Sequence, residues 1–236
     1  MESENTQSGD IYTVLGWLEK NRKNLITAVV VIILVGVGVS YYNWRKTEGQ
    51  IIAGEALSSV LMANLGTNVS ANSLLSVANS HAGTEAGSRA LLAAATQQFV
   101  DGKVSDAQAS FARFISDYPE STLIAQAKYG LAVCIESQGK TAEAITAYKE
   151  VVDRYAEDNT RPSGKLALGR LYEADGKLEL ARDSYMDIAR DSRSAVGMEA
   201  QTRLLGLLQK HPELQPKAPE TSAPRAAIAP SAAPAK

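Results

Sequence analysis

The chain has 236 residues, and its 24 Lys and Arg against 26 Asp and Glu give a formal net charge of −2. This balance argues against a general affinity for nucleic acid, which strongly basic proteins have. The single cysteine, Cys134, excludes an internal disulfide framework and a thiolate metal cluster within one chain. Aromatic residues make up only 6% and alanine is abundant, a composition that favours closely packed helices over sheets.

Residues 1–24 are predicted to be a cytoplasmic N-terminal segment. They contain a short amphipathic stretch at 11–18 and the basic residues Lys20, Arg22 and Lys23. The stretch is predicted to be either a helix lying on the membrane surface or a plain extension of the helix that follows.

Residues 25–44 are predicted to be a transmembrane anchor. From Leu25 to Tyr42 no residue is charged, and these 18 residues span about 27 Å as a helix, close to the roughly 30 Å hydrocarbon core. Tyr41 and Trp44 fit the aromatic belt at the far interface. A cleaved signal peptide is the alternative, but the leader is long and the apolar run exceeds the usual 7–15 residues. The basic leader favours a cytoplasmic N-terminus, which places the rest of the chain in the periplasm of a double-membraned bacterium.

A ladder of short motifs repeats at one step between residues 102 and 206. Gly102, Gly139 and Gly176 each precede a lysine and lie 37 residues apart, since 139 − 102 = 37 and 176 − 139 = 37. The same step relates a small residue, an aromatic residue and a leucine dipeptide. These are Ala107, Ala144 and Ala181; Phe111, Tyr148 and Tyr185; and Leu131-Ala132, Leu168-Gly169 and Leu205-Gly206. A fixed period of 20–50 residues is typical of stacked repeat proteins.

The register predicts a helical array over residues 84–210. Each glycine marks a tight turn with a positive φ, and in each second helix the small residue allows a close helix crossing that the aromatic residue fills. A last helix is expected to cap the array, with Leu205-Gly206 in register. The expected helices are 84–100 with 103–117, 122–137 with 140–155, 162–174 with 177–190, and 195–210.

Two further segments flank the array. Residues 49–83 are expected to form a degenerate leading helix pair, from helices at 50–65 and 70–80. Residues 211–236 contain six of the eight prolines and are predicted to be a disordered Pro/Ala-rich tail.

The repeat resembles the tetratricopeptide motif. Leu168-Gly169-Arg170-Leu171-Tyr172, followed by Ala181 and Tyr185, is similar to the pattern Leu-Gly-x-x-Tyr…Ala-x-x-x-Phe/Tyr, and the copy at Leu131 matches more loosely. The step of 37 residues instead of 34 implies about three extra residues per turn between repeats. The resemblance implies an all-α protein, in which a single N-terminal transmembrane helix precedes a tetratricopeptide-type α-solenoid of three to four helix pairs and a capping helix.

The layout as a whole resembles the YfgM-type family. The residues that carry this resemblance are the basic leader, the anchor ending in Tyr41-Tyr42-Asn43-Trp44-Arg45, and Gln97-Gln98-Phe99-Val100-Asp101. Members of that family are inner-membrane tetratricopeptide proteins with a periplasmic domain, regarded as ancillary subunits of the Sec translocon that contact periplasmic chaperones. The resemblance implies the same place and the same kinds of partner here.

No arrangement of residues indicates catalysis. A hydrolase needs a nucleophile with a positioned base, and the two histidines, His81 and His211, lie in a loop and at a helix end. The Gly-Lys turns lack the rest of a phosphate-binding loop. Cys134 is predicted to be a small core residue. We therefore expect no enzyme activity, no cofactor and no metal site.

The predicted binding site is the concave face formed by the first helix of each pair, the surface that stacked helical repeats use. The register places on it Arg89, Leu92, Thr96, Phe99, Gln126, Tyr129, Val133, Glu136, Ser163, Leu166, Arg170 and Glu173. For Leu92, Phe99, Val133 and Leu166 the alternative is a place in the core. The basic residue of the tetratricopeptide carboxylate clamp is replaced by Leu92, Tyr129 and Leu166. An apolar groove with a few charges suits an extended or amphipathic segment of another protein.

Two functions stay open. The first is a membrane-anchored, periplasm-facing adaptor at the Sec translocon or the envelope-assembly machinery, with translocon subunits, periplasmic chaperones or clients as partners. The second is a structural subunit of another envelope complex, such as a secretion or pilus machine. Neither function requires nucleic acid or a small-molecule substrate.

Overall fold

The computed structural model describes residues 6–63 and 69–215. In these residues every regular element is helical and no strand occurs. The chain divides into two compact units, Met1–Asp101 and Gly102–Lys236.

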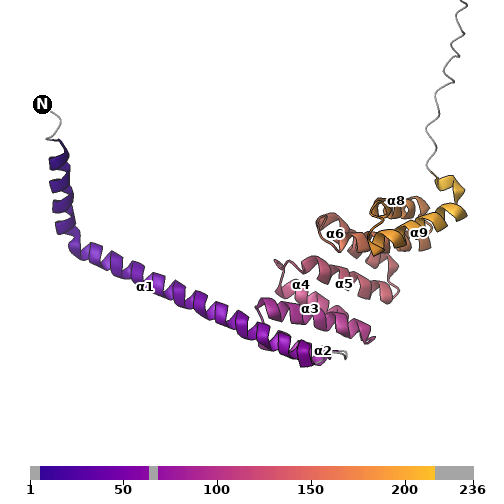
Figure 1. The fold of residues 1–236 in the computed structure, drawn as a ribbon, viewed down its shortest axis with the longest axis horizontal. Helices are drawn as coiled ribbons and strands as arrows, with labels where there is room; N and C mark the ends of the chain where they lie inside the picture. The colour runs from indigo at the N-terminus through magenta and orange to yellow at the C-terminus, as the bar shows by residue number, and fades with distance from the viewer. Residues whose placement is uncertain (1–5, 64–68, 216–236) are drawn as a thin grey trace, which may run out of the picture. The chain divides into compact units, whose positions relative to one another are not determined.

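The first unit contains α1 (Thr6–Ala63), α2 (Ala71–Ser80) and α3 (Glu85–Val100), and the C-terminal part of α1 lies beside α2 and α3 (Figure 1). Ala53 of α1 is fully buried there, and Gln50 Oε1 accepts a hydrogen bond of 2.9 Å from the Glu85 backbone N–H. Thr84 caps α3, because its Oγ1 accepts from the Gly87 N–H at 2.9 Å. The expected helix at 70–80 is confirmed.

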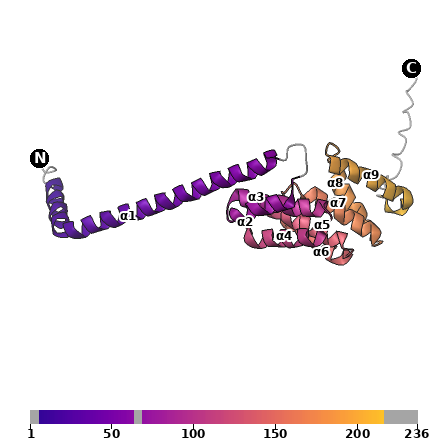
Figure 2. The same ribbon diagram turned by 90° about the horizontal axis from the view of Figure 1, so that it is seen from below.

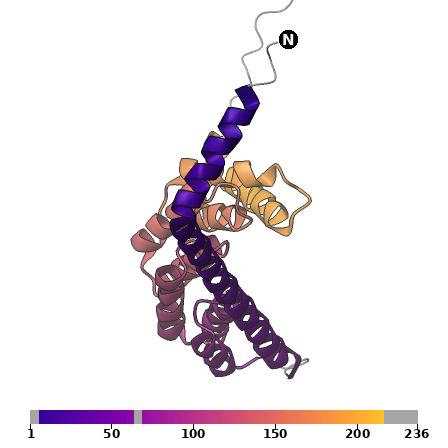
Figure 3. The same cartoon turned by 90° about the vertical axis from the view of Figure 1, so that its left-hand side faces the viewer.

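Helix α1 is one continuous helix, whereas the sequence predicted an anchor and a separate helix starting at residue 50 (Figure 3). The junction contains no proline, and Gly49 alone weakens a helix by only about 1 kcal/mol. Within Ile26–Ala63 the helix is long and apolar enough to cross a membrane, a test that a signal sequence also meets. Side chains such as Ile32 and Leu34 are exposed. The expected end of the second helix at Gly66 lies outside the described residues.

The second unit contains six α-helices and a short 3₁₀ helix among its described residues, and consecutive helices pack on one another (Figure 2). The predicted helices between residues 103 and 190 are confirmed, because the observed bounds of each helix differ from the predicted ones by at most two residues. Their bounds are α4 (Val104–Asp117), α5 (Ile124–Ser137), α6 (Thr141–Arg154), α7 (Arg161–Ala174), α8 (Leu178–Ala189), α9 (Ala195–Lys210) and η1 (Pro212–Leu214).

The glycines of the ladder form the turns that the sequence predicted. Gly102, Gly139 and Gly176 have φ values of 76°, 75° and 71°, in the left-handed region that glycine enters without a steric penalty. The Gly139 N–H donates to the Glu136 carbonyl at 2.9 Å, and the Lys140 N–H donates to the Ile135 carbonyl at 3.3 Å. These bonds satisfy carbonyl groups that the end of α5 would otherwise leave unpaired.

The small and aromatic residues of the ladder lie in the core, as predicted. Ala107, Ala144 and Ala181 are fully buried, and so are the rings of Tyr148 and Tyr185. The fit is tight against the neighbouring first helices, because a Cβ added at Gly169 would collide with the Tyr185 ring and one at Gly130 would collide with the Phe111 ring. Phe111 and Tyr185 therefore require a small residue on the helix that each packs against.

The 37-residue register does not reach α9, and the prediction that it does is wrong. Helices α5 and α7 begin 37 residues apart (161 − 124), but α7 and α9 begin 34 apart (195 − 161). Helix α8 is two residues shorter than α6, and the connection after it is one residue shorter. As a result Leu205 is 61% exposed, and Ala200 and Leu207 face the core instead.

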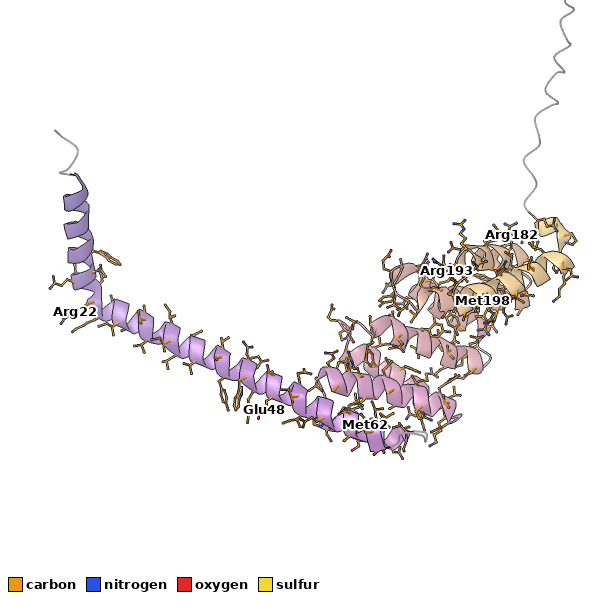
Figure 4. The ribbon with its side chains drawn as sticks, viewed as in Figure 1. Arg22, Glu48, Met62, Arg182, Arg193 and Met198 are labelled. Atoms are coloured by element: carbon orange, nitrogen blue, oxygen red, sulfur yellow. The ribbon has the colours of Figure 1, made fainter. Side chains whose placement is uncertain are left out.

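The folded part of the chain extends past Lys210, where the sequence placed the start of the Pro/Ala-rich tail. Leu214 of η1 is buried against Tyr185 and Leu207, and the Arg182 Nη1 donates to the Leu214 carbonyl at 3.3 Å (Arg182 is labelled in Figure 4). A proline at the start of a short helix is compatible with its missing N–H, so His211-Pro212 begins η1 rather than a tail. The predicted disorder of residues 216–236 falls outside the described residues.

Candidate polypeptide-binding face

The predicted face residues of the first unit lie on α3 in different environments. Leu92 is only 5% exposed and lies in the core, the alternative that the sequence left open for it. Phe99 is half-buried, and the Thr96 hydroxyl donates to the Leu92 carbonyl at 3.0 Å. Arg89 is exposed, pairs with Glu85 at 2.6 Å, and lines a hollow of about 480 Å³ between α3 and α1.

In the second unit, Gln126, Tyr129 and Ser163 line one surface hollow of about 340 Å³ where α5 and α7 begin. The register placed these three residues on one face, and the structure brings them together. The residues that complete the hollow come from the segments before the two helices. They are Thr122, Leu123, Asp158, Asn159 and Thr160.

Asp158 holds the segment before α7 in shape. Its Oδ1 accepts two hydrogen bonds from Thr160, at 2.8 Å from the backbone N–H and 2.6 Å from the hydroxyl. Such a turn, in which an aspartate side chain bonds to the backbone two residues on, fixes a connection locally. The Arg161 Nε donates a hydrogen bond of 3.3 Å to the Val152 carbonyl, which links the start of α7 to α6.

Tyr129 forms the aromatic part of the hollow. Its ring lies 5.6 Å from the Tyr148 ring, centroid to centroid, and is half-buried. Burial raises the pKa of the Tyr129 hydroxyl, Glu136 and Glu199 add to this, and Arg170 opposes it. The hydroxyl is therefore neutral at physiological pH and can both donate and accept.

Glu136 and Glu173 accept hydrogen bonds from tyrosines within the fold. The Tyr148 hydroxyl donates to Glu136 Oε2 at 2.6 Å, and the Tyr185 hydroxyl donates to Glu173 Oε2 at 3.0 Å. Burial and the carboxylate partner raise the pKa of both tyrosines. Arg170 Nη2 lies 3.6 Å from Glu136 Oε1 and links α7 to α5.

The accessible face is more polar than the sequence predicted. Leu166 is 8% exposed and packs with Tyr185 and Leu207, so it too belongs to the core, and Val133 is half-buried against the Tyr148 cluster. A first helix packs against second helices on two sides, which leaves only a narrow exposed strip. We call the strip of Gln126, Tyr129, Ser163 and Arg170 the α5–α7 face. It is a hydrogen-bonding surface and not an apolar groove.

Sequence reasoning missed two sets of residues. Asp158 and Thr160 were not among the predicted site residues, although Asp-x-Thr before a helix is a signal for a side-chain-stabilised turn. Glu199 and Arg203 of α9 act electrostatically on Tyr129 and Tyr185, respectively. They were missed because the predicted face residues end at Glu173 and include none from α9.

No group of three or more His, Cys, Asp or Glu among the described residues could hold a metal ion. Cys134 is fully buried, and burial raises the pKa of its thiol to about 11, so the thiol is protonated at physiological pH. This agrees with its predicted place in the core.

Residues 16–209 match the family model described as tetratricopeptide repeat-like domain. Two crystal structures of a Podosopora anserina putative kinesin light chain with nearly identical TPR-like repeats are similar, at 17% and 18% identity, each with a TM-score of 0.50, and cover 72% of this chain and 90% of theirs. PcrH from Pseudomonas aeruginosa is 20% identical with a TM-score of 0.45, over 52% of this chain and 92% of that one. At such identities the likeness shows the fold alone. No curated protein matches the chain.

Proposed function

Because the chain belongs to the tetratricopeptide repeat-like domain family, we propose that it is a non-catalytic scaffold that binds an extended segment of another protein on the α5–α7 face. The observation that carries the proposal is the hollow in which Gln126, Tyr129 and Ser163 meet. Within residues 6–63 and 69–215, the Gln126 amide and the Ser163 hydroxyl have no hydrogen-bond partner. These groups can pair with the backbone N–H and C=O groups that an extended segment presents.

The apolar part of α1 supports a membrane anchor. Its side chains are exposed along the stretch that is long enough to span a bilayer, and basic residues precede it. We place the N-terminus in the cytoplasm and the helical repeats in the periplasm of a bacterial inner membrane. Tethering raises the local concentration of the α5–α7 face, so weak binding to a nearby segment suffices.

In this setting the protein would act as an ancillary adaptor at the Sec translocon or the envelope-assembly machinery. The support is the YfgM-type layout of leader, anchor and repeats described above. The partners of such an adaptor are translocon subunits, periplasmic chaperones or clients emerging from the membrane.

A binding measurement on the detergent-solubilised full chain tests the proposal. The probe is a set of fluorescein-labelled, 12-residue uncharged peptides that are extended in solution, followed by fluorescence anisotropy. Tyr129→Ala should weaken binding at least about fivefold, as expected when an aromatic contact at the centre of an interface is removed. Tyr172→Ala removes a similar side chain elsewhere on α7 and should leave binding unchanged. Equal binding by the Tyr129→Ala variant and the parent chain would show that the face is wrongly assigned.

One observation favours the structural-subunit alternative. Met198 and Leu205 are exposed on α9, and residues seven apart lie on the same face of a helix (Met198 is labelled in Figure 4). The terminal helix of a repeat array normally has a polar outer face, so a permanent partner could cover this one. In that case Met198→Lys with Leu205→Lys would release the protein from a stoichiometric complex, and Tyr129→Ala would not.

A further inference from the structure

The hollow at the start of α5 and α7 has a distinctive chemical lining. Its lining includes the aromatic residue Tyr129 and the acidic residue Asp158 but no lysine or arginine. The remaining polar side chains are neutral amides and hydroxyls, each of which offers an oxygen acceptor. They are Thr122, Gln126, Asn159, Thr160 and Ser163.

The Asp158 carboxylate has an unused oxygen. Oδ1 accepts both bonds from Thr160, whereas Oδ2 has no partner among the described parts of the chain. Arg161 is the nearest basic residue in the sequence, and its Nε is bonded to the Val152 carbonyl. The carboxylate therefore has no ion-pair partner among the residues that the structure describes.

The two helix starts at the hollow do not reverse this charge. The start of a helix carries about half a positive charge, so the two starts together offset at most about the one negative charge of the carboxylate beside α7 and leave no excess to hold an anion. At α5, the Leu123 backbone N–H already donates to Ser121 Oγ at 3.2 Å. An anion in the hollow would also face Asp158, and no basic side chain lines the hollow to hold it, which disfavours a carboxylate or phosphate ligand.

A carboxylate, an aromatic ring and neutral oxygen acceptors together form a site for a cation. We propose that the hollow binds a lysine or arginine side chain of the extended segment that lies on the α5–α7 face. The proposal rests on the proposed function and adds a sequence preference to it: a segment with a basic residue at this position binds better than one with a neutral or acidic residue.

Three fluorescein-labelled peptides on one uncharged 12-residue framework test the preference. They carry Arg, Gln or Glu at the central position and are blocked at both ends, and binding to the full chain in detergent is followed by fluorescence anisotropy at low salt. The Arg peptide should bind roughly tenfold tighter than the Glu peptide, and added salt should reduce the difference because it screens exposed charges. Asp158→Asn should abolish the preference. Its amide oxygen still accepts both Thr160 bonds, so the turn before α7 is kept.

Glu157→Gln is the matched control. Glu157 is exposed and adjacent to Asp158 but does not line the hollow, so this variant should keep the preference for the Arg peptide. Equal affinity for the three peptides, or an unchanged preference in Asp158→Asn, would overturn the inference. If Tyr129→Ala still weakens the binding of all three peptides, the proposed function survives that result. If no peptide binds at all, both proposals fall.

Discussion

The Tyr148 hydroxyl donates a hydrogen bond of 2.6 Å to Glu136, and 37 residues later Tyr185 makes the same bond to Glu173. A second contact repeats with the same step. Lys128 pairs with Glu150 at 2.6 Å, and Lys165 pairs with Asp187. The ladder is therefore a repeat of interactions as well as of residue types: two polar contacts join the first and second helix in both the α5–α6 and the α7–α8 pair. In the preceding copy, Phe99 and Phe111 occupy the positions of Glu136 and Tyr148, so that copy lacks the hydrogen bond.

Tyr148→Phe should destabilise the protein by about 1–2 kcal/mol, because it removes the hydroxyl and leaves the half-buried Glu136 carboxylate with fewer partners. Urea unfolding followed by circular dichroism measures the change. Tyr172→Phe is the control, since no hydrogen bond to its hydroxyl occurs within the described residues, and it should be nearly neutral. Equal stability of Tyr148→Phe and the parent chain would contradict a structural role for this bond.

Stability should fall when the pH rises through the range where exposed tyrosine and cysteine ionise. The pKa of Tyr148 and Tyr185 is raised by burial and by their glutamate partners, and the pKa of Cys134 is raised from 9.0 to about 11 by burial. Above pH 9 the unfolded chain loses these protons first, which favours unfolding. Their stabilising contribution is complete below pH 9 and is lost progressively above it.

Thermal melts between pH 8 and 11 measure this dependence. Cys134→Ala should flatten the decline between pH 9 and 11, because the variant has no thiol to ionise in the unfolded chain. A melting temperature that falls equally steeply in the parent chain and in Cys134→Ala would exclude the thiol as a contributor.

Gly169→Ala and Gly206→Ala should have opposite effects, although both change a Leu-Gly dipeptide of the ladder. At Gly169 a Cβ meets the Tyr185 ring, so the variant should lose about 1–3 kcal/mol through overpacking. At Gly206 nothing lies within 4 Å of the added Cβ, and alanine should stabilise α9 by about 0.5–1 kcal/mol. Urea unfolding of the two variants measures the change in the free energy of unfolding and shows whether it has the expected sign in each. If Gly206→Ala destabilised the protein instead, Gly206 would be as crowded as Gly169, and α9 would follow the 37-residue register after all.

Leu214→Ala should destabilise the second unit by about 2–3 kcal/mol, the usual effect of truncating a buried leucine. Ending the chain after Gln215 should leave stability unchanged, because Leu214 and its contacts are kept. Differential scanning calorimetry distinguishes the two cases. An unaffected Leu214→Ala variant would mean that η1 adds nothing to the core around Tyr185.

The ladder predicted the helices from α4 to α8 because each of its residue types has one strong local reason. Glycine at 139 and 176 satisfies a positive φ, and alanine at 144 and 181 permits a close crossing. These requirements depend on neighbours in the same repeat, so they are visible in the sequence. The register of α9 could not be predicted from the ladder, because it depends on the lengths of α8 and of the connection after it.

The candidate site was predicted only in part. Gln126, Tyr129 and Ser163 follow from the register, but the burial of Leu92 and Leu166 depends on how far neighbouring helices wrap around the first helix of each pair. Periodicity alone does not determine how much of the first helix its neighbours cover. Asp158 was missed for a different reason, because its role depends on the turn that its own side chain forms with Thr160.

Photocrosslinking from the α5–α7 face of the full chain in bacterial inner membranes tests most directly whether this face binds a polypeptide. A photoreactive residue at Gln126 should crosslink to extended polypeptide segments, and mass spectrometry of the crosslinked peptides should show a lysine or arginine near the attachment point. The same residue at Glu143, exposed on α6 and outside the hollow, should give few or none. Equal crosslinking from positions 126 and 143, or crosslinks from 126 with no common segment, would contradict the central claim that this face binds a polypeptide.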